Sequence, residues 1–451
     1  MTRQAPSALF AVLLLVTAIL AIQPAQAVEV QRVRSPGGLE AWLVEDHSNP
    51  IISLSLAFRG GAALDPQGKE GLAAMAAGVI DEGAGDLDSQ AFQGRLEDLS
   101  IHLSFSADMD SFTGGVQSLT ENRDTAFDLL RLALTEPRFD AEPVERIRSQ
   151  ILAGLTRQSE DPDTIAGRVL NKLLYPQHPY GRPSGGTLES IATIQVDDLR
   201  RFVAERFGRD VLVVGVVGDI SAAELGPLLD RTFAALPAEA APFDVAKTDP
   251  AASDDLVVIE KDVPQSVVVL GQKGIARNDP DYYAAYTVNY ILGGGGFASR
   301  LYEEVREKRG LAYSVYSYLY PLDHSALVVG GVATKNSRVA ESLDLIRQEW
   351  KRMAEEGPTA DELRDAKTYL TGSFPLRFSS SDRITGMLVG MQTENLGIDY
   401  LDRRNSFIEA VTIEDARRVA RRLYDASALT VVVVGRPEGL KPTRPAPKLE
   451  G

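Results

Sequence analysis

The chain has 451 residues, of which 44% are hydrophobic and 24% charged, a composition that supports two or three globular domains and excludes a disordered or fibrous protein. Acidic residues outnumber basic ones by 63 to 47, and the net charge of -16 argues against a protein that binds nucleic-acid phosphates. The sequence contains no cysteine, which excludes disulfides, thiolate metal sites and a cysteine nucleophile.

The N-terminal segment has the features of a secretory signal. Arg3 precedes an apolar stretch over residues 8–22, and an Ala-Gln-Ala cleavage site ends at Ala27. The apolar run is shorter than the ~20 residues that a membrane span needs. We therefore expect cleavage before Val28, no membrane span in the mature chain, and a location in the periplasm or a similar compartment.

The two halves of the chain repeat one pattern. Runs of β-branched and apolar residues end at Gly218 and Gly435, and an amphipathic helix pattern precedes each run. Gly218 and Gly435 are 217 residues apart, and the same offset relates Arg200 to Arg417 in the preceding helices. A constant offset across a helix, a turn and a strand indicates that the chain is a duplication of one unit.

Within each unit, strand-like runs are interleaved with long amphipathic helices, without a regular βαβ order. This pattern predicts two homologous α+β domains, each with helices packed on one face of a mostly antiparallel sheet. A stretch rich in Pro, Ala and Asp between the units should be an exposed linker, and the Pro-rich C-terminus should be loosely held. The expected parts are a signal peptide at 1–27, an N-terminal domain at 28–237, the linker at 238–255, a C-terminal domain at 256–436 and a tail at 437–451.

The most informative segment lies in the second half. Gly293–Gly296 lead into a predicted helix with acidic residues early, basic residues late and a stop at Gly310. No Gly-Lys-Ser/Thr follows the glycines, so the segment does not have the pattern of a phosphate-binding loop. A strand comes next, and its alternation predicts that Leu311, Tyr313 and Val315 point to one face of the sheet.

This segment closely resembles the second domain of the pitrilysin/insulinase family, the inverted-zincin metallopeptidases, in the branch that includes mitochondrial processing peptidase and its bacterial relatives. The resemblance covers nearly the whole chain after the signal, because the duplicated domains, the linker and the segment from Asp65 to Leu72 also fit. In that family an Arg and a Tyr, seven residues apart in the second domain, reach across to the zinc site. They match Arg306 and Tyr313 here.

A guanidinium and a phenol both donate hydrogen bonds, so the resemblance implies that Arg306 and Tyr313 grip a substrate carbonyl and the oxyanion that develops from it. Taken without the resemblance, the residues favour a plainer interpretation. Arg306 would then be a solvated helix charge and Tyr313 a half-buried strand residue.

Active members of the family carry His-x-x-Glu-His after a Gly-Leu-Ala segment, where the histidines bind zinc and the glutamate activates the bound water. This chain has Ala74, Ala77 and Gly78 at those three positions. The third ligand of the family, a later glutamate, falls near residues 150–155, which contain no carboxylate. The four histidines are His47, His102, His178 and His324, and no two of them have the spacing of a pair of metal ligands. We therefore expect no metal and no cofactor in this chain, and no zinc peptidase activity from it alone.

In two-chain members of the family, one subunit holds the zinc and the other lends its Arg and Tyr. The resemblance therefore implies the zinc-free subunit of a periplasmic heterodimeric peptidase, with a homologous zinc-bearing subunit as partner and unfolded peptides as substrates that add to a sheet edge. One alternative is a non-enzymatic peptide-binding or scaffold protein of the same fold. Another is a hydrolase with a relocated site, although the sequence has no Gly-x-Ser-x-Gly motif.

Overall fold

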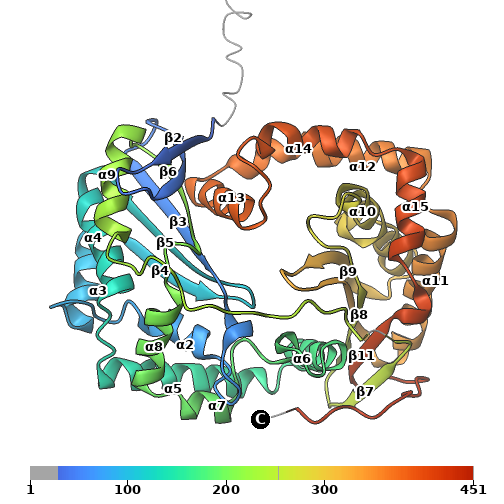
Figure 1. Cartoon of the computed structure of the whole chain (residues 1–451). Coiled ribbons are helices and arrows are strands. Elements are labelled where there is room, and N and C mark those ends of the chain that lie inside the picture. Colours follow the sequence, from blue (N-terminus) through green and yellow to red (C-terminus); the bar gives the residue numbers. More distant parts are fainter. Residues whose placement is uncertain (1–28, 252, 450–451) are drawn as a thin grey trace, which may run out of the picture.

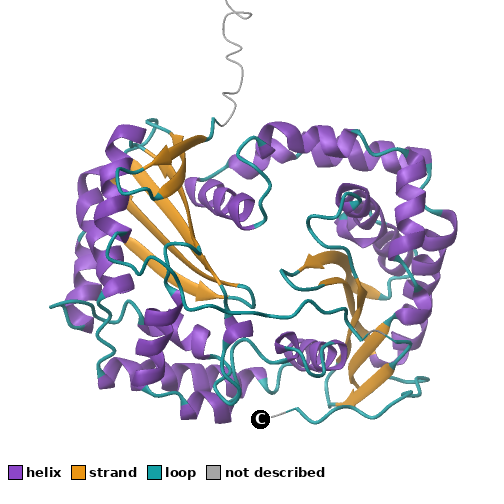
Figure 2. Ribbon diagram, viewed as in Figure 1, coloured by secondary structure: helices purple, strands orange, loops and turns teal. Residues whose placement is uncertain are grey.

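Each half of the chain is built around one β-sheet, and helices line the outside of both sheets (Figures 1 and 2). The computed structural model describes residues 29–251 and 253–449. The expected signal peptide, residues 1–27, lies outside these ranges. No helix in the described ranges is long and apolar enough to cross a membrane.

The first sheet has six strands in the order β1-β2-β6-β3-β5-β4, and every neighbouring pair is antiparallel except β2 with β6. Its strands are β1 Gln31–Arg34, β2 Glu40–Glu45, β3 Ile51–Arg59, β4 His102–Ala107, β5 Ser111–Leu119 and β6 Leu212–Gly218. Apolar residues of the sheet form one core with helices of the same half. The helices that contribute apolar residues to this core are α2 Leu72–Val79, α3 Ser89–Asp98, α4 Arg123–Thr135, α5 Ala141–Gln158, α7 Leu188–Thr193, α8 Val196–Arg206 and α9 Ala222–Phe233.

The second sheet has five strands in the order β7-β11-β8-β10-β9, with only β11 and β7 parallel. The strands are β7 Leu256–Glu260, β8 Gln265–Lys273, β9 Ala312–Pro321, β10 Ala326–Lys335 and β11 Thr430–Gly435. The accompanying helices are α10 Tyr282–Asn289, α11 Val339–Glu356, α12 Ala360–Gly372, α14 Tyr400–Glu409 and α15 Ile413–Leu423. These two sheets and their helices confirm the predicted α+β fold.

The predicted duplication is visible in the topology. β6 and β11, the strands that end at Gly218 and Gly435, each pair antiparallel with one neighbour and parallel with the other. The preceding helices α8 and α15 both begin with a capping box. Every residue of β11 is buried, because Val431 and Val433 face one apolar cluster while Val432 and Val434 face another. Burial on both faces explains why the sequence of this strand does not alternate.

Two helices are exchanged between the halves. Helix α6 (Pro162–Leu174) packs on β8 and β11 of the second sheet, and helix α13 (Ser381–Thr393) packs on β3 and β6 of the first (Figure 1). A glycine permits each close approach, because a Cβ at Gly215 would lie 2.8 Å from Leu388 Cβ and one at Gly271 would lie 3.0 Å from Leu174 Cδ1. Each sheet therefore has helices of its own half on one face and a helix of the other half on part of the second face.

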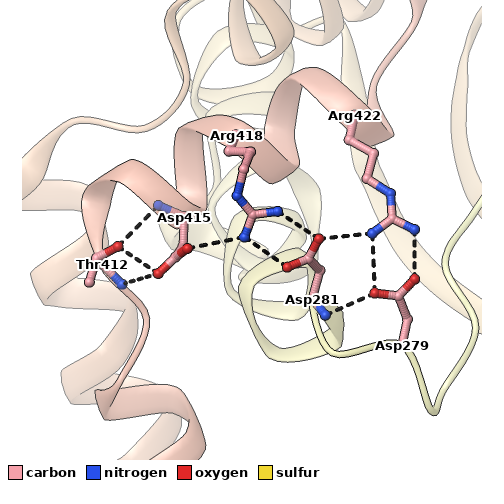
Figure 3. A network of polar contacts seen from close by, with 6 residues as sticks. All are labelled: Asp279, Asp281, Thr412, Asp415, Arg418 and Arg422. Carbon is pink, nitrogen blue, oxygen red and sulfur yellow. Dashed lines mark hydrogen bonds and ion pairs between the residues drawn. The ribbon is translucent and has the colours of Figure 1, made fainter.

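Asp65 and Asp279, each followed by a proline in the sequence, serve different purposes in the two halves. The Asp65 carboxylate accepts hydrogen bonds from the backbone N–H groups of Gly71, at 2.9 Å, and Ala73, at 3.1 Å, at the start of α2. Asp279 instead pairs with Arg422 of α15 at 2.6 Å, and Asp281 forms a bidentate pair with Arg418 at 2.7 and 2.8 Å (Figure 3). This ion-pair network holds α15 against the start of α10.

The linker and the tail are both held more firmly than the sequence predicted. In the linker, Val245 is buried in an apolar cluster with α6, and the Thr248 N–H donates to the His324 carbonyl at 2.9 Å. In the tail, the Thr443 N–H donates to the carbonyl of Leu256 in β7 at 2.8 Å. Most described residues of both segments are exposed, as expected, but composition does not reveal these long-range contacts.

Candidate functional site

The structure brings Arg306 and Tyr313 together. Arg306 lies in a π-helical turn, Tyr302–Glu307, and Tyr313 is the second residue of β9. The guanidinium carbon of Arg306 is 4.7 Å from the ring centroid of Tyr313 and equally 4.7 Å from that of Tyr302. The exposed ring of Phe297 is 5.6 Å from the same carbon. Three aromatic rings therefore hold the guanidinium through cation–π contacts.

The turn that carries Arg306 departs from the regular α-helix expected there. The Lys308 N–H donates to the Glu303 carbonyl, five residues earlier, at 2.9 Å, and the Leu311 N–H donates to the Val305 carbonyl at 2.9 Å. Gly310 has a φ of +60°, which permits the chain to leave the turn and enter β9. Single π-helical turns occur frequently at functional sites.

A β-bulge decides where Tyr313 points. Val315 is opposite Val332, whereas Ala312 is opposite Thr334, so three steps along β9 match only two along β10. The prediction that Leu311, Tyr313 and Val315 share one face is therefore wrong. Leu311 and Val315 are buried, while Tyr313 is 82% exposed, because simple alternation takes no account of an extra residue.

The polar groups of Arg306 and Tyr313 remain available to a ligand. Within the described ranges, the one ion pair of Arg306 is with its neighbour Glu307, at a long N···O distance of 3.9 Å. The Tyr313 hydroxyl makes no hydrogen bond to any described residue. Both side chains line a shallow depression of about 380 Å³, together with Gln265 and Lys335. Two hydrogen-bond donors thus meet on one open surface.

A buried ion pair supports the segment that carries this site. Arg300, which is 6% exposed, binds Glu362 of α12 through two hydrogen bonds of 2.6 and 2.7 Å. Burial opposes ionisation of Glu362, but the hydrogen bonds from Arg300 and Thr359 outweigh it and lower the pKa of Glu362 to about 2. The pair therefore stays charged at neutral pH and fixes the start of the π-helical turn on α12.

The positions of the lost zinc motif form an apolar surface. Ala74, Ala77 and Gly78 lie on α2, which packs against α5, the helix that also contains residues 150–155. A Cβ at Gly78 would lie 3.1 Å from Ile147 Cγ2 of α5. Nowhere in residues 29–251 and 253–449 do three or more His, Asp or Glu side chains gather as a metal would require.

The histidines make other contacts. His47 Nδ1 lies 2.6 Å from Asp219 Oδ1, and this hydrogen bond raises the pKa of His47. His178 Nε2 lies 2.9 Å from the carbonyl oxygen of Ala246 in the linker.

Some residues of the site were missed by the sequence reasoning. Tyr302 and Phe297 hold Arg306, and neither was singled out. Tyr302 precedes Arg306 by four residues, a spacing that places two side chains on one side of a helical turn. That spacing was a usable signal, whereas the contact with Phe297 depends on the conformation of the glycine run.

The fold is a duplicated α+β unit in which the partly buried Arg306 lies beside the exposed Tyr313, and alanine and glycine replace the zinc-motif residues. These features define a peptidase-like protein without the zinc machinery. Residues 41–188 match the family described as Insulinase (Peptidase family M16), and residues 193–370 match the Peptidase M16 inactive domain. The chain belongs to peptidase family M16. The expected family is confirmed.

Relatives of the chain include proteins named as peptidases and as non-peptidases. The non-peptidase homolog YmxG of Helicobacter pylori is 33% identical over 335 residues, which are 74% of this chain and 77% of that protein. A protein of Bacillus subtilis named as an uncharacterized zinc protease is 26% identical and covers 68% of this chain and 74% of its own length. The first of these names supports a zinc-free member of the family, whereas the second belongs to a protein named for zinc.

Solved structures show the same fold. The peptidase M16 inactive domain from Pseudomonas fluorescens superposes with a TM-score of 0.85 at 31% identity, over 93% of this chain and 100% of the other. A chain of Complex III2 from Candida albicans superposes with a TM-score of 0.77 over 91% of this chain and 97% of its own length. At 15% identity, this second likeness bears on the fold alone.

Proposed function

We propose that this chain is the zinc-free subunit of a periplasmic heterodimeric metallopeptidase and lends Arg306 and Tyr313 to a homologous zinc-bearing partner. The observation that carries this proposal is the geometry of the pair. A purely structural tyrosine in a β-strand is normally half-buried, whereas a bulge turns Tyr313 outward, beside a guanidinium that three aromatic rings hold in place.

The pair has the donors that an acyl-transfer reaction needs. In the proposed complex, the partner's zinc would supply the activated water. The Arg306 guanidinium would donate to the substrate carbonyl, and the Tyr313 hydroxyl would donate to the oxyanion as charge develops on that oxygen. Preorganised donors are effective because they need no rearrangement as the reaction proceeds.

The position of β9 suits an extended peptide substrate. β9 is an edge strand of the second sheet, and Tyr313 lies at its start. The outward backbone groups of an edge strand can pair with a peptide that adds as a further strand. Such a peptide would run beside the Arg306/Tyr313 pair.

The apolar surface at Ala74, Ala77 and Gly78 explains why a partner is needed, since this chain has nothing at those positions to bind or activate water. The competing proposal is a non-enzymatic peptide-binding or scaffold protein. A likeness in fold to a chain of Complex III2 is compatible with it, but a scaffold does not require two adjacent donors that line one open depression.

Reconstitution distinguishes the two proposals. The mature chain from Val28 onward should be purified with and without a homologue from the same cell that carries His-x-x-Glu-His, and hydrolysis of unfolded peptides should be measured. The proposal predicts no hydrolysis by this chain alone and faster hydrolysis by the mixture. If the chain is stable but neither associates with such a homologue nor changes the homologue's activity, the result would support the scaffold proposal instead.

A further inference from the structure

A second cavity lies away from Arg306 and Tyr313, between α6 and the segment 176–187. Its volume is about 890 Å³, which is within the range of sites for small ligands and short peptide segments. Its walls combine apolar side chains, including Leu155 and Tyr175, with basic ones, including Arg168 and Arg182. The peptidase proposal makes no use of this cavity.

Two arginines of the cavity, Arg168 and Arg182, are incompletely paired. The Nε groups of Arg168 and Arg182 are buried without a hydrogen-bond partner. The other two guanidinium nitrogens of Arg182 donate to the backbone carbonyls of Asp65, at 2.9 Å, and Ala63, at 3.0 Å. Arg168 forms no ion pair or hydrogen bond with any described residue. Arg182 also lies 3.8 Å from Glu70, so Arg168 is the better candidate to bind an anion. Its side chain is half-buried and only its Nε is fully covered, so its terminal nitrogens can donate to a ligand that brings a carboxylate to this wall.

The C-terminal tail reaches the same cavity from the other half of the molecule. The tail is attached to the edge strand β7 by the Thr443 backbone, and Arg444 pairs with Asp255 at 2.9 Å. Pro445 and Pro447 restrict the next residues to extended conformations. Leu449 then lines the cavity and packs on the apolar cluster formed by α6 and the second sheet.

We propose that this cavity is a peptide-binding site for an extended, proline-containing segment with an aliphatic side chain and a nearby carboxylate, and that the chain's own C-terminal tail is its resident ligand. The tail acts as a strap from the second sheet to the first half. Because its local concentration in cis is high, it excludes free peptides until its anchor is weakened. The inference does not depend on the proposed peptidase partner.

A labelled peptide with the sequence of residues 440–451, LKPTRPAPKLEG, is the probe. Fluorescence anisotropy should detect little binding of this peptide to the full mature chain. The Leu449→Asp variant should bind it saturably, one to one and at least ~10-fold more tightly, because an aspartate does not stay on the apolar wall and the tail leaves the cavity. Lys448→Ser is the matched control in the same tail, since Lys448 is exposed, and it should bind as weakly as the unaltered chain. Truncation after Arg444 is a second way to empty the cavity and should act like Leu449→Asp.

The binding wall is tested in the Leu449→Asp background. Adding Arg168→Gln should weaken peptide binding about tenfold, as expected for loss of a charged hydrogen bond. Adding Arg200→Gln, which alters an exposed arginine on α8, should leave binding unchanged. Equal binding to the full chain and to Leu449→Asp, no binding to either emptied form, or equal effects of the two arginine variants would each overturn the proposal.

Discussion

The guanidinium carbon of Arg306 lies 4.7 Å from the centre of the Tyr313 ring, although a π-helical turn, a glycine and a β-bulge separate the two residues along the chain. Each of these irregular features is needed to place the two donors on one surface. The geometry occurs in a chain whose described residues include no cluster of metal ligands, and this combination is the basis of the subunit proposal.

The first prediction concerns this pair in the reconstituted complex. Arg306→Ala and Tyr313→Phe should each lower kcat/KM by about 10²-fold, the size of effect seen when an oxyanion donor is removed. Arg306→Lys should recover only part of the loss, because an ammonium lacks the planar fork of a guanidinium. Steady-state hydrolysis of a fluorogenic peptide by the one-to-one mixture measures all three.

Matched controls for these variants are available in the same half. Arg338→Ala removes an exposed arginine that pairs with Glu341 at 2.7 Å, and Tyr369→Phe alters an exposed tyrosine on α12. Both should leave kcat/KM within about twofold, since a surface ion pair contributes little. Unchanged turnover in Arg306→Ala and Tyr313→Phe would contradict the lending mechanism.

The second prediction concerns the ion pair beneath the site. Arg300→Ala leaves the Glu362 carboxylate half-buried and without its main partner, so it should reduce the free energy of unfolding by about 3–5 kcal/mol. Urea denaturation followed by circular dichroism measures this loss. A loss no larger than that of Arg338→Ala would show that the pair is not structural.

The third prediction tests the helix exchange. A Cβ at Gly215 would lie 2.8 Å from Leu388 Cβ and 2.9 Å from the Thr385 carbonyl oxygen, so Gly215→Val should push α13 away from the first sheet. We expect a loss of about 1–3 kcal/mol in stability, as for other overpacked cores. Gly386→Ala, where a Cβ meets nothing within 4 Å in the same helix, should be neutral or slightly stabilising. Equal effects of the two variants in thermal denaturation would contradict the account.

The fourth prediction concerns pH. Burial raises the pKa of Asp65 to about 7, against the opposing hydrogen bonds from Ala73 and Gly71 and the charges of Arg182 and Arg206. Between about pH 4 and pH 7, the folded state thus keeps a proton that the unfolded state has lost. Asp65 alone should therefore make the free energy of unfolding fall as pH rises through that window, by up to about 1.4 kcal/mol per pH unit.

Asp65→Asn cannot titrate and should flatten this dependence when urea unfolding is measured at several pH values. The exposed Asp197→Asn variant is the control and should keep the original slope. If Asp65→Asn keeps that slope as well, then Asp65 is ionised throughout the window.

The fifth prediction concerns metal. The purified chain should contain far less than one zinc ion per molecule by elemental analysis, and EDTA should leave its thermal midpoint unchanged, because none of the described residues form a metal-ligand cluster. A midpoint that falls with EDTA and recovers with added zinc would contradict this expectation.

Local sequence signals predicted much of the fold. The strands that end at Gly218 and Gly435, and the helices before them, were predicted because each is a continuous pattern over about ten residues. The exchange of α6 and α13 was not predicted. An amphipathic stripe shows that a helix packs on something apolar, but it does not show which sheet that is.

The site was predicted less completely than the fold. The resemblance indicated Arg306 and Tyr313, and their proximity is seen in the structure. The direction of Tyr313 was predicted wrongly, because one extra residue in a strand reverses which face the following side chains occupy. The docking of Leu449 also depends on contacts between distant segments, which composition does not encode.

The most direct test of the subunit proposal is a titration. A zinc-bearing homologue from the same cell should be held at fixed concentration while the mature chain is added, with the rate of peptide hydrolysis recorded at each step. The proposal predicts a rate that rises and then levels off at a ratio of one to one, with no rise for the Arg306→Ala variant. A rate that does not depend on the added chain, or that rises equally with the variant, would contradict it.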